Sequence, residues 1–541
     1  MKYLVWIWRN SAGVRLNMLS RIAVGTGRVG SGLLMVWLCK RFIDTTIHTG
    51  TVTDVILMIV ALLGTITAGV FSRQLYYYWG VRATAVQSTA IRLRIFSHLF
   101  QRQIYDSKDM HSGDITSRLE KDIEVVSDAT STQLTDMAIT AIQLTGAFLM
   151  MMSMDTKLAW MLLLLTPLFI VVGKLIAHRM RQMTLDIRQQ ESVIQMLLQE
   201  TIEHNAVLRS LESGGWVTGR LDDMQHDLRG KINRRARFTL FSRLFMGLNF
   251  SLGYIIAFIW GGLQLRSGLI TFGVMTSFLQ LVSQIQQPIL QMLNLVPQAF
   301  QASASIDRLV ELEQAETEEA AKENKLLHGK TGLIVDNLSF HYATGDRQIF
   351  SHFSHQFPPG SKTALMGHTG VGKTTLFRLL LALVKPTEGT LTIYNSTEEV
   401  PIDNTTRCNF VFVPQGNTLM SGTIRYNLLL AKPKASDEEL KKVLHTAMAD
   451  FVLDLPEGLN SECGERGGGL SEGQAQRIAI ARGLLRPGNI MLLDEISASL
   501  DEQTEQELYR RLFDAYPHKT MIFITHRPIV SRLCNATISL D

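Results

Sequence analysis

The sequence contains few cysteines and little excess charge, and each shortage excludes a class of protein. Among its 541 residues there are four cysteines, none of them in a C-x-x-C pair: Cys39, Cys408, Cys463 and Cys534. Such scattered cysteines predict neither a disulfide framework nor a zinc site. The formal net charge is only +4, which gives no indication of a nucleic-acid partner.

The first residues also lack an apolar run long enough for a secretory signal peptide. They contain large apolar side chains instead, among them Trp6 and Trp8. Because tryptophan is enriched where a membrane meets water, we expect a short helix at the membrane interface rather than a frayed polar tail.

Apolar residues, by contrast, are abundant. They make up 46% of the chain, and the mean hydropathy is +0.11. A chain of this length is too long for one compact domain, and we expect part of it to contact lipid. About six segments are predicted to be transmembrane helices: residues 22–40, 55–79, 136–154, 158–178, 241–263 and 271–296.

Two long polar insertions separate the second predicted helix from the third and the fourth from the fifth. Both are rich in arginine and lysine, whereas the short loops on the other side carry chiefly Arg41, Lys157 and Arg266. Basic residues favour the cytoplasmic side of a membrane, so both insertions and both termini are predicted to be cytoplasmic.

The composition changes twice after the last predicted helix. Residues 311–330 are acidic and have no hydrophobic stripe, which indicates a linker. Beyond them, short β-rich runs alternate with helical ones, as in a mostly parallel α/β domain. The sequence therefore predicts an all-α six-helix transmembrane domain at 1–310, followed by an α/β domain at 331–541. Its strands are expected at 332–340, 362–367, 408–414, 490–494 and 520–525.

A glycine-rich segment follows one of these strands and opens a helix. It matches the pattern G-x-x-x-x-G-K-[ST] and comprises Gly367, His368, Thr369, Gly370, Val371, Gly372, Lys373 and Thr374, with Thr375 next. Glycines let backbone N–H groups surround phosphate oxygens, and the helix N-terminus adds partial positive charge. We expect Lys373 to reach the β and γ phosphates of ATP, and the Thr374 hydroxyl to bind Mg²⁺. The α/β domain is therefore predicted to be an α/β P-loop nucleotide-binding domain.

An apolar strand, residues 490–493, leads into two carboxylates, Asp494 and Glu495. Burial of the strand alone does not require two acidic residues at its end, so a functional role is favoured. We expect Asp494 to hold Mg²⁺ through water, and Glu495 to polarise the attacking water as a general base.

In these features the chain resembles an ATP-binding cassette (ABC) transporter of the half-size exporter type, over nearly its whole length. The most specific element is Leu470-Ser-Glu-Gly-Gln474, which resembles the signature motif of this family. The resemblance implies one membrane domain fused to one nucleotide-binding domain. It also implies that Ser471, Gly473 and Gln474 contact ATP.

The resemblance gives roles to three further residues, each of which, taken alone, would be an ordinary surface or core residue. Tyr342 matches the aromatic residue that stacks on adenine. Gln415 matches the glutamine that binds magnesium near the membrane-domain contact. His526 matches the histidine that contacts the γ-phosphate during catalysis.

In this family the signature of one subunit closes on the ATP held by the other, which implies a dimer. Since the chain carries both Glu495 and a near-complete signature, a homodimer with two competent sites is the simplest assembly. A heterodimer with a similar chain remains an alternative. Residues 497–501 match the loop that crosses the dimer interface, which implies that Asp501 lies near ATP. Glu472 stands where the family most often has glycine, and we expect its carboxylate to point away from phosphate.

Residues 106–122 and 200–212 resemble the loops that hold the family's coupling helices, and residues 464–467 resemble the exporter loop that touches them. The resemblance implies that ATP closes the nucleotide domains, that the coupling helices follow, and that the membrane helices change from inward- to outward-facing. The composition of these segments is equally compatible with charged helices that are only exposed to solvent.

The last predicted helix carries amide side chains on one face. Their spacing alternates between four and three residues: Gln280, Gln284, Gln287, Gln291, Asn294, Gln298 and Gln301. An unpaired amide facing lipid costs about a few kcal/mol, so we expect this face to line a water-filled pathway. The alternative is a polar seam between helices.

Arg28, Arg73 and Arg243 lie within predicted membrane helices. An arginine inside a membrane is costly unless its side chain snorkels to the interface, which is one interpretation of these residues. The other is a ring of cations for an anionic or amphiphilic cargo.

The predicted function is that of an ATP-driven exporter or flippase in a bacterial inner membrane, with ATP and Mg²⁺ as cofactors. A lipid, a peptide and an amphiphilic drug are the candidate cargoes. An importer with an exporter-like fold and a non-transporting regulatory ATPase or channel remain alternatives. The expected partners are a second copy of the chain, membrane lipids and the cargo, with no nucleic acid.

Overall fold

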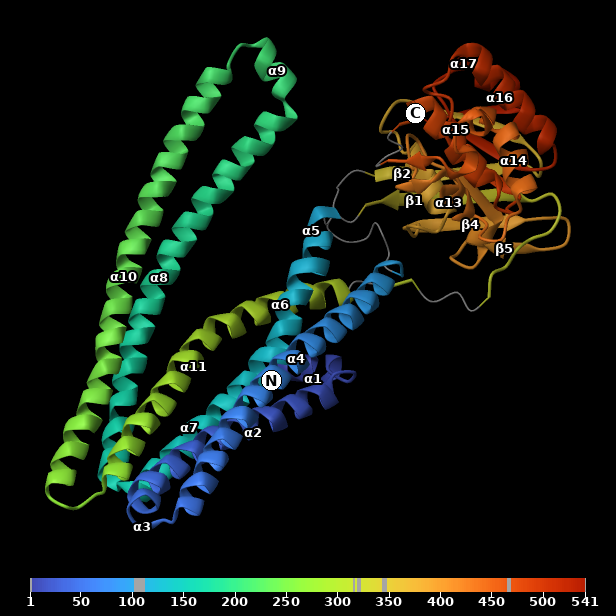
Figure 1. Cartoon of the computed structure of the whole chain (residues 1–541). Helices are drawn as coiled ribbons and strands as arrows, with labels where there is room; N and C mark the ends of the chain where they lie inside the picture. The colour runs from blue at the N-terminus through green and yellow to red at the C-terminus, as the bar shows by residue number, and fades with distance from the viewer. Residues whose placement is uncertain are drawn as a thin grey trace. The chain divides into compact units, whose positions relative to one another are not determined.

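The structure, a computed structural model, describes residues 2–101, 112–314, 317–318, 323–342, 348–464 and 469–540. The chain divides into two compact units (Figure 1). The first contains Met1–Phe96 and Gly113–Glu313, and the second contains Ser97–Ser112 and Gln314–Asp541.

The first unit is helical throughout its described residues apart from short turns. Its short helices are α1 (Lys2–Asn10), α3 (Ile47–Thr49), α5 (Ser112–Ser117), α6 (Ile123–Asp128) and α9 (Asn205–Ser210). Its long helices are α2 (Arg15–Arg41), α4 (Val52–Leu99), α7 (Leu134–Met154), α8 (Thr156–Glu203), α10 (Gly214–Arg266) and α11 (Phe272–Glu313). Turns of π-helix occupy Phe42–Thr46, Arg118–Asp122 and Ala129–Gln133. Each predicted membrane segment falls on a different long helix.

Within the described residues, three stretches are long and apolar enough to cross a membrane: Arg15–Thr49, Val52–Leu99 and Gly113–Met154. The middle stretch exposes large apolar side chains along its length, including Leu57, Leu63 and Phe71. Soluble proteins rarely expose a continuous apolar surface of this kind, so contact with lipid tails accounts for it.

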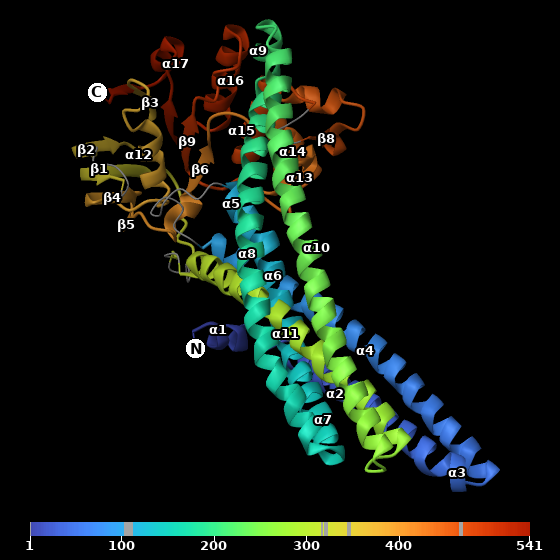
Figure 2. The ribbon, with the colours of Figure 1, turned by 90° about the vertical axis from the view of Figure 1, so that its left-hand side faces the viewer.

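The second polar insertion is formed by continuous extensions of the helices α8 and α10, which contain the fourth and fifth predicted membrane segments. The helix α8 has 48 residues and α10 has 53. At helical rise these lengths correspond to roughly 70–80 Å, against ~30 Å for the hydrocarbon core of a bilayer. The two helices lie side by side, and α9 lies at the turn between them (Figure 1 and Figure 2). Their extensions are joined by a small apolar cluster that includes Ile194 and Leu228.

A single residue, Asp155, separates α7 from α8. Its Oδ1 atom accepts hydrogen bonds from the backbone N–H groups of Lys157 at 2.8 Å and Leu158 at 3.0 Å. Its Oδ2 atom accepts a hydrogen bond from Trp260 Nε1 at 2.9 Å. The carboxylate therefore caps the first turn of α8 and ties that turn to α10.

The N-terminal residues form the helix α1, but the two tryptophans differ in their surroundings. Trp6 is buried and donates a hydrogen bond to Glu313 Oε2 at 3.3 Å. Trp8 is exposed, and the guanidinium of Arg15 lies 4.2 Å from the centre of its ring. Only Trp8 is thus available to a membrane interface.

The second unit contains the predicted parallel sheet. Its strand order is β11-β3-β10-β9-β6. The strands are β3 (Lys362–Met366), β6 (Phe410–Val413), β9 (Ile490–Asp494), β10 (Thr520–Ile524) and β11 (Ala536–Ser539). All residues of β9 and β10 are buried, as expected for parallel strands covered on both faces. The helices are α12 (Lys373–Leu380), α13 (Ile424–Leu429), α14 (Asp437–Thr446), α15 (Glu472–Leu484), α16 (Glu502–Ala515) and α17 (Pro528–Leu533).

The first predicted strand belongs to a separate antiparallel sheet of order β2-β1-β4-β5. These strands are β1 (Gly332–His341), β2 (Gln348–Phe357), β4 (Glu388–Tyr394) and β5 (Glu399–Pro401), and the strands β7 (Gly422–Thr423) and β8 (Glu462–Cys463) form a small pair. The sequence predicted β1 alone among the four strands, because β2 has histidine, serine and glutamine among its apolar residues.

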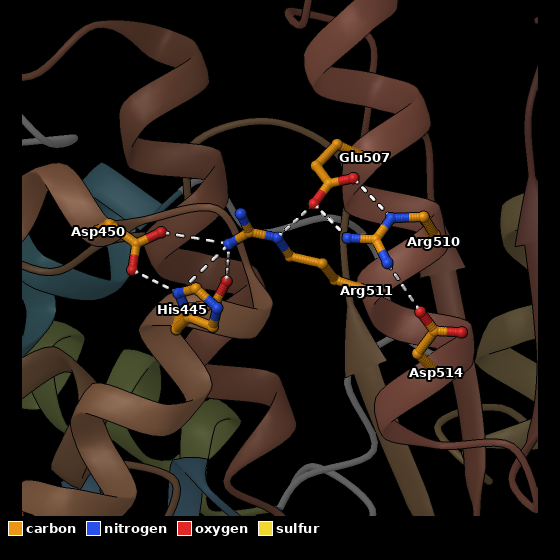
Figure 3. A network of polar contacts seen from close by, with 6 residues as sticks. All are labelled: His445, Asp450, Glu507, Arg510, Arg511 and Asp514. Carbon is orange, nitrogen blue, oxygen red and sulfur yellow. Dashed lines mark hydrogen bonds and ion pairs between the residues drawn. The ribbon is translucent and has the colours of Figure 1, made fainter.

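A network of charged side chains joins α14 to α16 (Figure 3). Arg511 lies at its centre. It donates to the carbonyl oxygen of His445 at 2.8 Å, to Asp450 Oδ2 at 3.3 Å and to Glu507 Oε1 at 2.8 Å. The neighbouring Arg510 bonds only within α16, to Glu507 and Asp514, among the contacts drawn in Figure 3.

We expect Arg511→Ala to destabilise the second unit by about 1–2 kcal/mol, because it removes several hydrogen bonds that join two elements. Arg510→Ala is the matched control. Its side chain is 62% exposed, against 22% for Arg511, and we expect less than about 0.5 kcal/mol. Thermal unfolding of the full chain in detergent measures both effects. Equal losses in the two variants would contradict the linking role of Arg511.

Candidate nucleotide-binding site

The glycine-rich loop connects β3 to α12, and its backbone requires glycine. Gly367, Gly370 and Gly372 have φ angles of 148°, 85° and 112°. A Cβ atom on Gly367 would lie 2.2 Å from the carbonyl oxygen of Leu540, and one on Gly372 would lie 2.5 Å from Ile349 Cγ2. The loop therefore has the small residues that phosphate-binding loops use, directly before a helix N-terminus.

Lys373 is the first residue of α12, and its ammonium lies over the loop. Its Nζ atom donates to the carbonyl oxygens of Gly367 at 2.6 Å and His368 at 3.1 Å, and lies 3.2 Å from His526 Nε2. Burial lowers the pKa of Lys373, while the nearby carboxylates of Glu495 and Asp494 oppose that shift. The positive charge is held where the loop would receive an anion.

The two carboxylates at the end of β9 have different surroundings. Asp494 is buried, and its Oδ2 atom accepts a hydrogen bond from Thr374 Oγ1 at 3.3 Å. Burial, together with the charge of Glu495, raises the pKa of Asp494 to about 6. Glu495 accepts a hydrogen bond from Gln415 Nε2 at 2.6 Å, and its Oε1 atom lies 3.4 Å from His526 Nε2.

Four predicted residues from four separate motifs thus form one chain of contacts, in the order Lys373, His526, Glu495 and Gln415. The order follows from the sheet. These residues lie beyond the carboxyl ends of β3, β10, β9 and β6, which are neighbours in that order. Ligands of open parallel sheets bind at this edge.

The backbone of Glu495 is held in an unusual conformation. Its φ angle is 46°, in the left-handed region that few non-glycine residues adopt. Its N–H donates to the carbonyl oxygen of Ile524 at 2.9 Å, and its own carbonyl oxygen accepts from Gln476 Nε2 at 2.9 Å. Strain of this kind persists only where the surroundings enforce it, and it is common at functional sites.

No motif in the sequence singled out Gln476. It lies in α15, is 2% exposed, and accepts a hydrogen bond from Ser499 Oγ at 2.7 Å. The amide therefore links the signature helix both to Glu495 and to the segment 497–501. Since α15 contains other polar residues, among them Gln474 and Arg477, the sequence contains no signal that distinguishes Gln476.

The signature residues lie at the start of α15. Ser471 Oγ accepts from the N–H of Gln474 at 3.2 Å, and Gln474 Oε1 accepts from the N–H of Ser471 at 2.9 Å. This reciprocal pair is a capping box. The Cβ position of Gly473 lies 3.1 Å from the carbonyl oxygen of Ser499, so a larger residue would press on that segment. Glu472 is exposed.

Two more of the predicted site residues have structural partners. The hydroxyl of Tyr342 lies 3.3 Å from Thr375 Oγ1 and accepts from Arg378 Nη1 at 3.0 Å, which places the ring beside the phosphate-binding loop. Asp501 caps α16 by accepting from the N–H of Thr504 at 3.0 Å. The predicted exporter loop falls mostly outside the described residues, which omit 465–468.

The predicted coupling loops are described in part. Residues 106–111 fall outside the described residues, and the rest of the first loop is helical. The segment 200–212 contains α9, a short helix between the ends of α8 and α10.

The residues predicted to line a pathway do not all lie together. Arg28, Gln291 and Gln298 line a cavity of about 420 Å³ in the first unit. Arg73 and Arg243 are exposed. Of the remaining amides, Gln280 and Gln284 are half-buried, Gln287 and Gln301 are exposed, and the side chain of Asn294 is not among those described.

Two family models match the chain. The model described as the ABC transporter transmembrane region matches residues 26–289, and the model described as ABC transporter matches residues 350–498.

Relatives match over most of the chain. An ATP-dependent lipid A-core flippase from Desulfotalea psychrophila is 27% identical over 471 residues, which cover 86% of this chain and 81% of the flippase. A lactococcin-A transport/processing ATP-binding protein from Lactococcus lactis subsp. lactis is 28% identical over 459 residues, which cover 83% of this chain and 62% of that protein.

The solved structure of a bacterial Atm1-family ABC exporter with ATP bound superimposes with a TM-score of 0.81 at 22% sequence identity, and the match covers 98% of this chain and 95% of the exporter. The predicted fold, a helical transmembrane domain followed by an α/β nucleotide-binding domain, is confirmed. Since the two models match one chain in that order, the chain belongs to the ATP-binding cassette transporters, as a half-size chain of the exporter type.

Proposed function

We propose that two copies of this chain form an ATP-hydrolysing exporter or flippase in a bacterial inner membrane. The observation that carries the proposal is the contact chain of Lys373, His526, Glu495 and Gln415 at the edge of the parallel sheet. It brings a cation for phosphate together with a carboxylate that can act as a base. The names of the two relatives, a flippase and a transport protein, support a transport role.

ATP would bind across the glycine-rich loop. The backbone N–H groups of the loop and the N-terminus of α12 would surround the phosphates. The ammonium of Lys373 would exchange the carbonyl oxygens of Gly367 and His368 for β- and γ-phosphate oxygens. The ring of Tyr342, adjacent to Thr375, is positioned to stack on adenine.

The side chains around Asp494 fit a magnesium ion. The Thr374 hydroxyl contacts Asp494, and the amide of Gln415 contacts the adjoining Glu495. Hydroxyl, carboxylate and amide oxygens are the hard ligands that Mg²⁺ prefers, with one or two carboxylates and the nucleotide phosphates as its usual set. When bound, the ion neutralises charge on the phosphates.

Glu495 would take a proton from the water that attacks the γ-phosphorus. The bond between that phosphorus and the β–γ bridging oxygen breaks, which leaves ADP and inorganic phosphate. Gln415 donates to one carboxylate oxygen, the Nε2 atom of His526 lies 3.4 Å from the other, and Gln476 and Ile524 hold the backbone. The base is therefore oriented before the substrate arrives, which lowers the cost of reaching the transition state.

A dimer would complete each site. The capping box of Ser471 and Gln474 fixes the N-terminus of α15, and the N–H groups at such a terminus attract phosphate. In the dimer we propose, this terminus closes on the ATP held by the partner. Closure would move the membrane helices through the coupling loops, and hydrolysis would reopen the pair.

Transport by the purified chain in sealed liposomes tests the proposal. With the nucleotide domains outside, addition of ATP should drive a labelled cargo into the liposome lumen, and ATP turnover should rise with cargo. An importer would move the cargo outward under the same conditions. A regulatory ATPase or channel would show no ATP-driven accumulation.

Gln476 offers a test of how Glu495 is oriented. We expect Gln476→Met to lower kcat for ATP hydrolysis roughly 10-fold with little change in KM for ATP, because the base shifts while the phosphate loop stays intact. Ser499→Ala removes the donor to the other end of the same amide and should act in the same direction with a smaller effect. A rise in KM with unchanged kcat would contradict this positioning role.

A further inference from the structure

The cavity in the first unit combines charges of both signs. It has a volume of about 420 Å³ and lies among α2, α4, α7, α11 and the π-helical turn Ala129–Gln133. Its ionisable side chains include Arg28, Asp128 and Asp136, and Gln291 and Gln298 of α11 add amides. Cavities of this size hold small molecules or the head of a larger one.

Asp136 accepts two hydrogen bonds at the wall of the cavity. Arg21 Nη2 donates to its Oδ1 atom at 2.9 Å, and the hydroxyl of Tyr76 donates to the same oxygen. Among the hydrogen bonds of the described residues none ends on Oδ2, and the side chain is 37% exposed. The carboxylate is thus fixed by two donors while one oxygen stays available.

The support behind Asp136 is buried and closely packed. Arg21 is 4% exposed, donates to the carbonyl oxygen of Ser131 at 2.8 Å, and lies 4.2 Å from the centre of the Tyr76 ring. Two glycines make room for this arrangement. A Cβ atom on Gly80 would lie 3.0 Å from Arg21 Cζ, and one on Gly25 would lie 3.1 Å from Tyr76 and 2.1 Å from Ile139.

The cavity is also lined by a second carboxylate, that of Asp128, and by the guanidinium of Arg28. Asp128 Oδ2 accepts from Gln133 Nε2 at 3.0 Å. Gln133 and Thr132 face the cavity from the π-helical turn, a feature that often marks functional sites. Arg28 lies 5.4 Å from the Tyr76 ring, and the ion pairs of the described residues give it no carboxylate partner.

These charges restrict the ligand. A purely anionic ligand would be repelled by Asp128 and by the free oxygen of Asp136, and a purely cationic one by Arg28. An apolar ligand would leave the amides and charges of the wall without partners. A ligand with both an ammonium and an anionic group would satisfy both kinds of wall.

We propose that this cavity binds a zwitterionic group, with an ammonium against Asp128 and Asp136 and a carboxylate or phosphate against Arg28. The inference rests on the proposed transport function and names the cargo class. Arg73 and Arg243, which like Arg28 lie within predicted membrane helices, do not line this cavity. The zwitterion belongs to a short peptide or to an ethanolamine phospholipid head, and the two sources share this chemistry.

Direct binding tests the proposal without any need for turnover. The full chain is placed in nanodiscs of phosphatidylglycerol and titrated calorimetrically with the tripeptide Leu-Ala-Leu, its N-acetyl form and its C-terminal amide. We expect the zwitterionic peptide to bind about 10- to 100-fold more tightly than either blocked form, since each loses one charge-assisted contact. In the lipid arm, phosphatidylethanolamine added to phosphatidylglycerol vesicles should stimulate ATP turnover, whereas phosphatidylcholine, which has no ammonium hydrogens, should not.

Variants that remove one charge test which side chains bind the anionic group and which bind the ammonium of the ligand. With Arg28→Gln, the zwitterion should bind no more tightly than the C-terminal amide, and with Asp128→Asn no more tightly than the N-acetyl form. Arg82→Gln, an exposed arginine on α4 outside the cavity, is the control and should bind as the unaltered chain does. If Arg28→Gln and Asp128→Asn leave all affinities unchanged, or if neither the peptide nor phosphatidylethanolamine has an effect, the proposal is wrong. Absence of ATP turnover with binding intact would instead contradict the transport function.

Discussion

Replacing Glu495 with glutamine is expected to slow ATP hydrolysis by about 100- to 10,000-fold and to leave ATP bound. Glutamine has the same size, and its amide oxygen still accepts a hydrogen bond from Gln415, but it does not take a proton from water. The nucleotide domains should therefore close on ATP and fail to reopen. Phosphate release in liposomes measures turnover, and retention of labelled ATP through gel filtration measures trapping.

Glu502→Gln is the matched control for this experiment. Glu502 has the same side chain and lies in the first turn of α16, where it is exposed. That variant should hydrolyse ATP at the rate of the unaltered chain. A Glu495→Gln variant with ordinary turnover would falsify the role of this carboxylate. If the Glu495→Gln variant hydrolyses ATP slowly but retains none, the result would contradict the closure of two nucleotide domains on ATP. It would still agree with Glu495 as the general base.

The proximity of the motif residues in the candidate nucleotide site could be predicted because each motif is local and a parallel sheet brings the motifs together. Each of Lys373, Glu495 and His526 is recognisable within a few neighbouring residues. Strands of one direction bring their carboxyl ends to the same edge, so motifs far apart in the chain meet there. The order β3-β10-β9-β6, which fixes the order of contacts, is a property of the fold that the motifs alone do not contain.

Gln476 shows what local motifs leave out. Its role depends on two backbone and side-chain partners, Glu495 and Ser499, that lie 19 and 23 residues away in the chain. Whether a buried amide finds its hydrogen bonds is decided by tertiary packing. The same reason explains why the strands β2, β4 and β5 were not predicted. The pairing of β2 and β4 with β1, and of β5 with β4, rests on contacts across the chain rather than on a hydrophobic alternation.

The membrane half was predictable at the level of helices and not at the level of side-chain partners. Hydropathy located a segment on each of the long helices, since a span must be apolar and of a minimum length. It gave no sign that Arg21 would be buried against Asp136 of another helix. The arginines in membrane segments allowed two interpretations, snorkelling to the interface or a ring of cations. The cavity at Arg28 has carboxylates as well, because its wall is assembled from several helices.

A loss of ATP binding by about 100-fold is expected for Lys373→Met, which keeps the length of the side chain and removes its charge. Among the described residues, Lys373 is the only lysine whose ammonium contacts the glycine-rich loop. It donates to the carbonyl oxygens of Gly367 and His368. Fluorescence titration with a labelled ATP analogue measures the affinity, and the variant should also lose turnover.

A second buried lysine, Lys362, serves as a control that distinguishes phosphate binding from a purely structural role. Lys362 Nζ donates to the carbonyl oxygens of Gly360 at 3.2 Å, Pro517 at 3.2 Å and Lys519 at 2.7 Å, so it also holds loop carbonyls from a buried position. Because those carbonyls lie away from the glycine-rich loop, Lys362→Met should lower the melting temperature and leave ATP affinity unchanged. If both variants lose stability and neither loses affinity, Lys373 holds the loop together but does not bind phosphate. If Lys373→Met alone loses affinity, the ammonium is the phosphate ligand, and its bonds to the loop carbonyls hold it in place for the nucleotide.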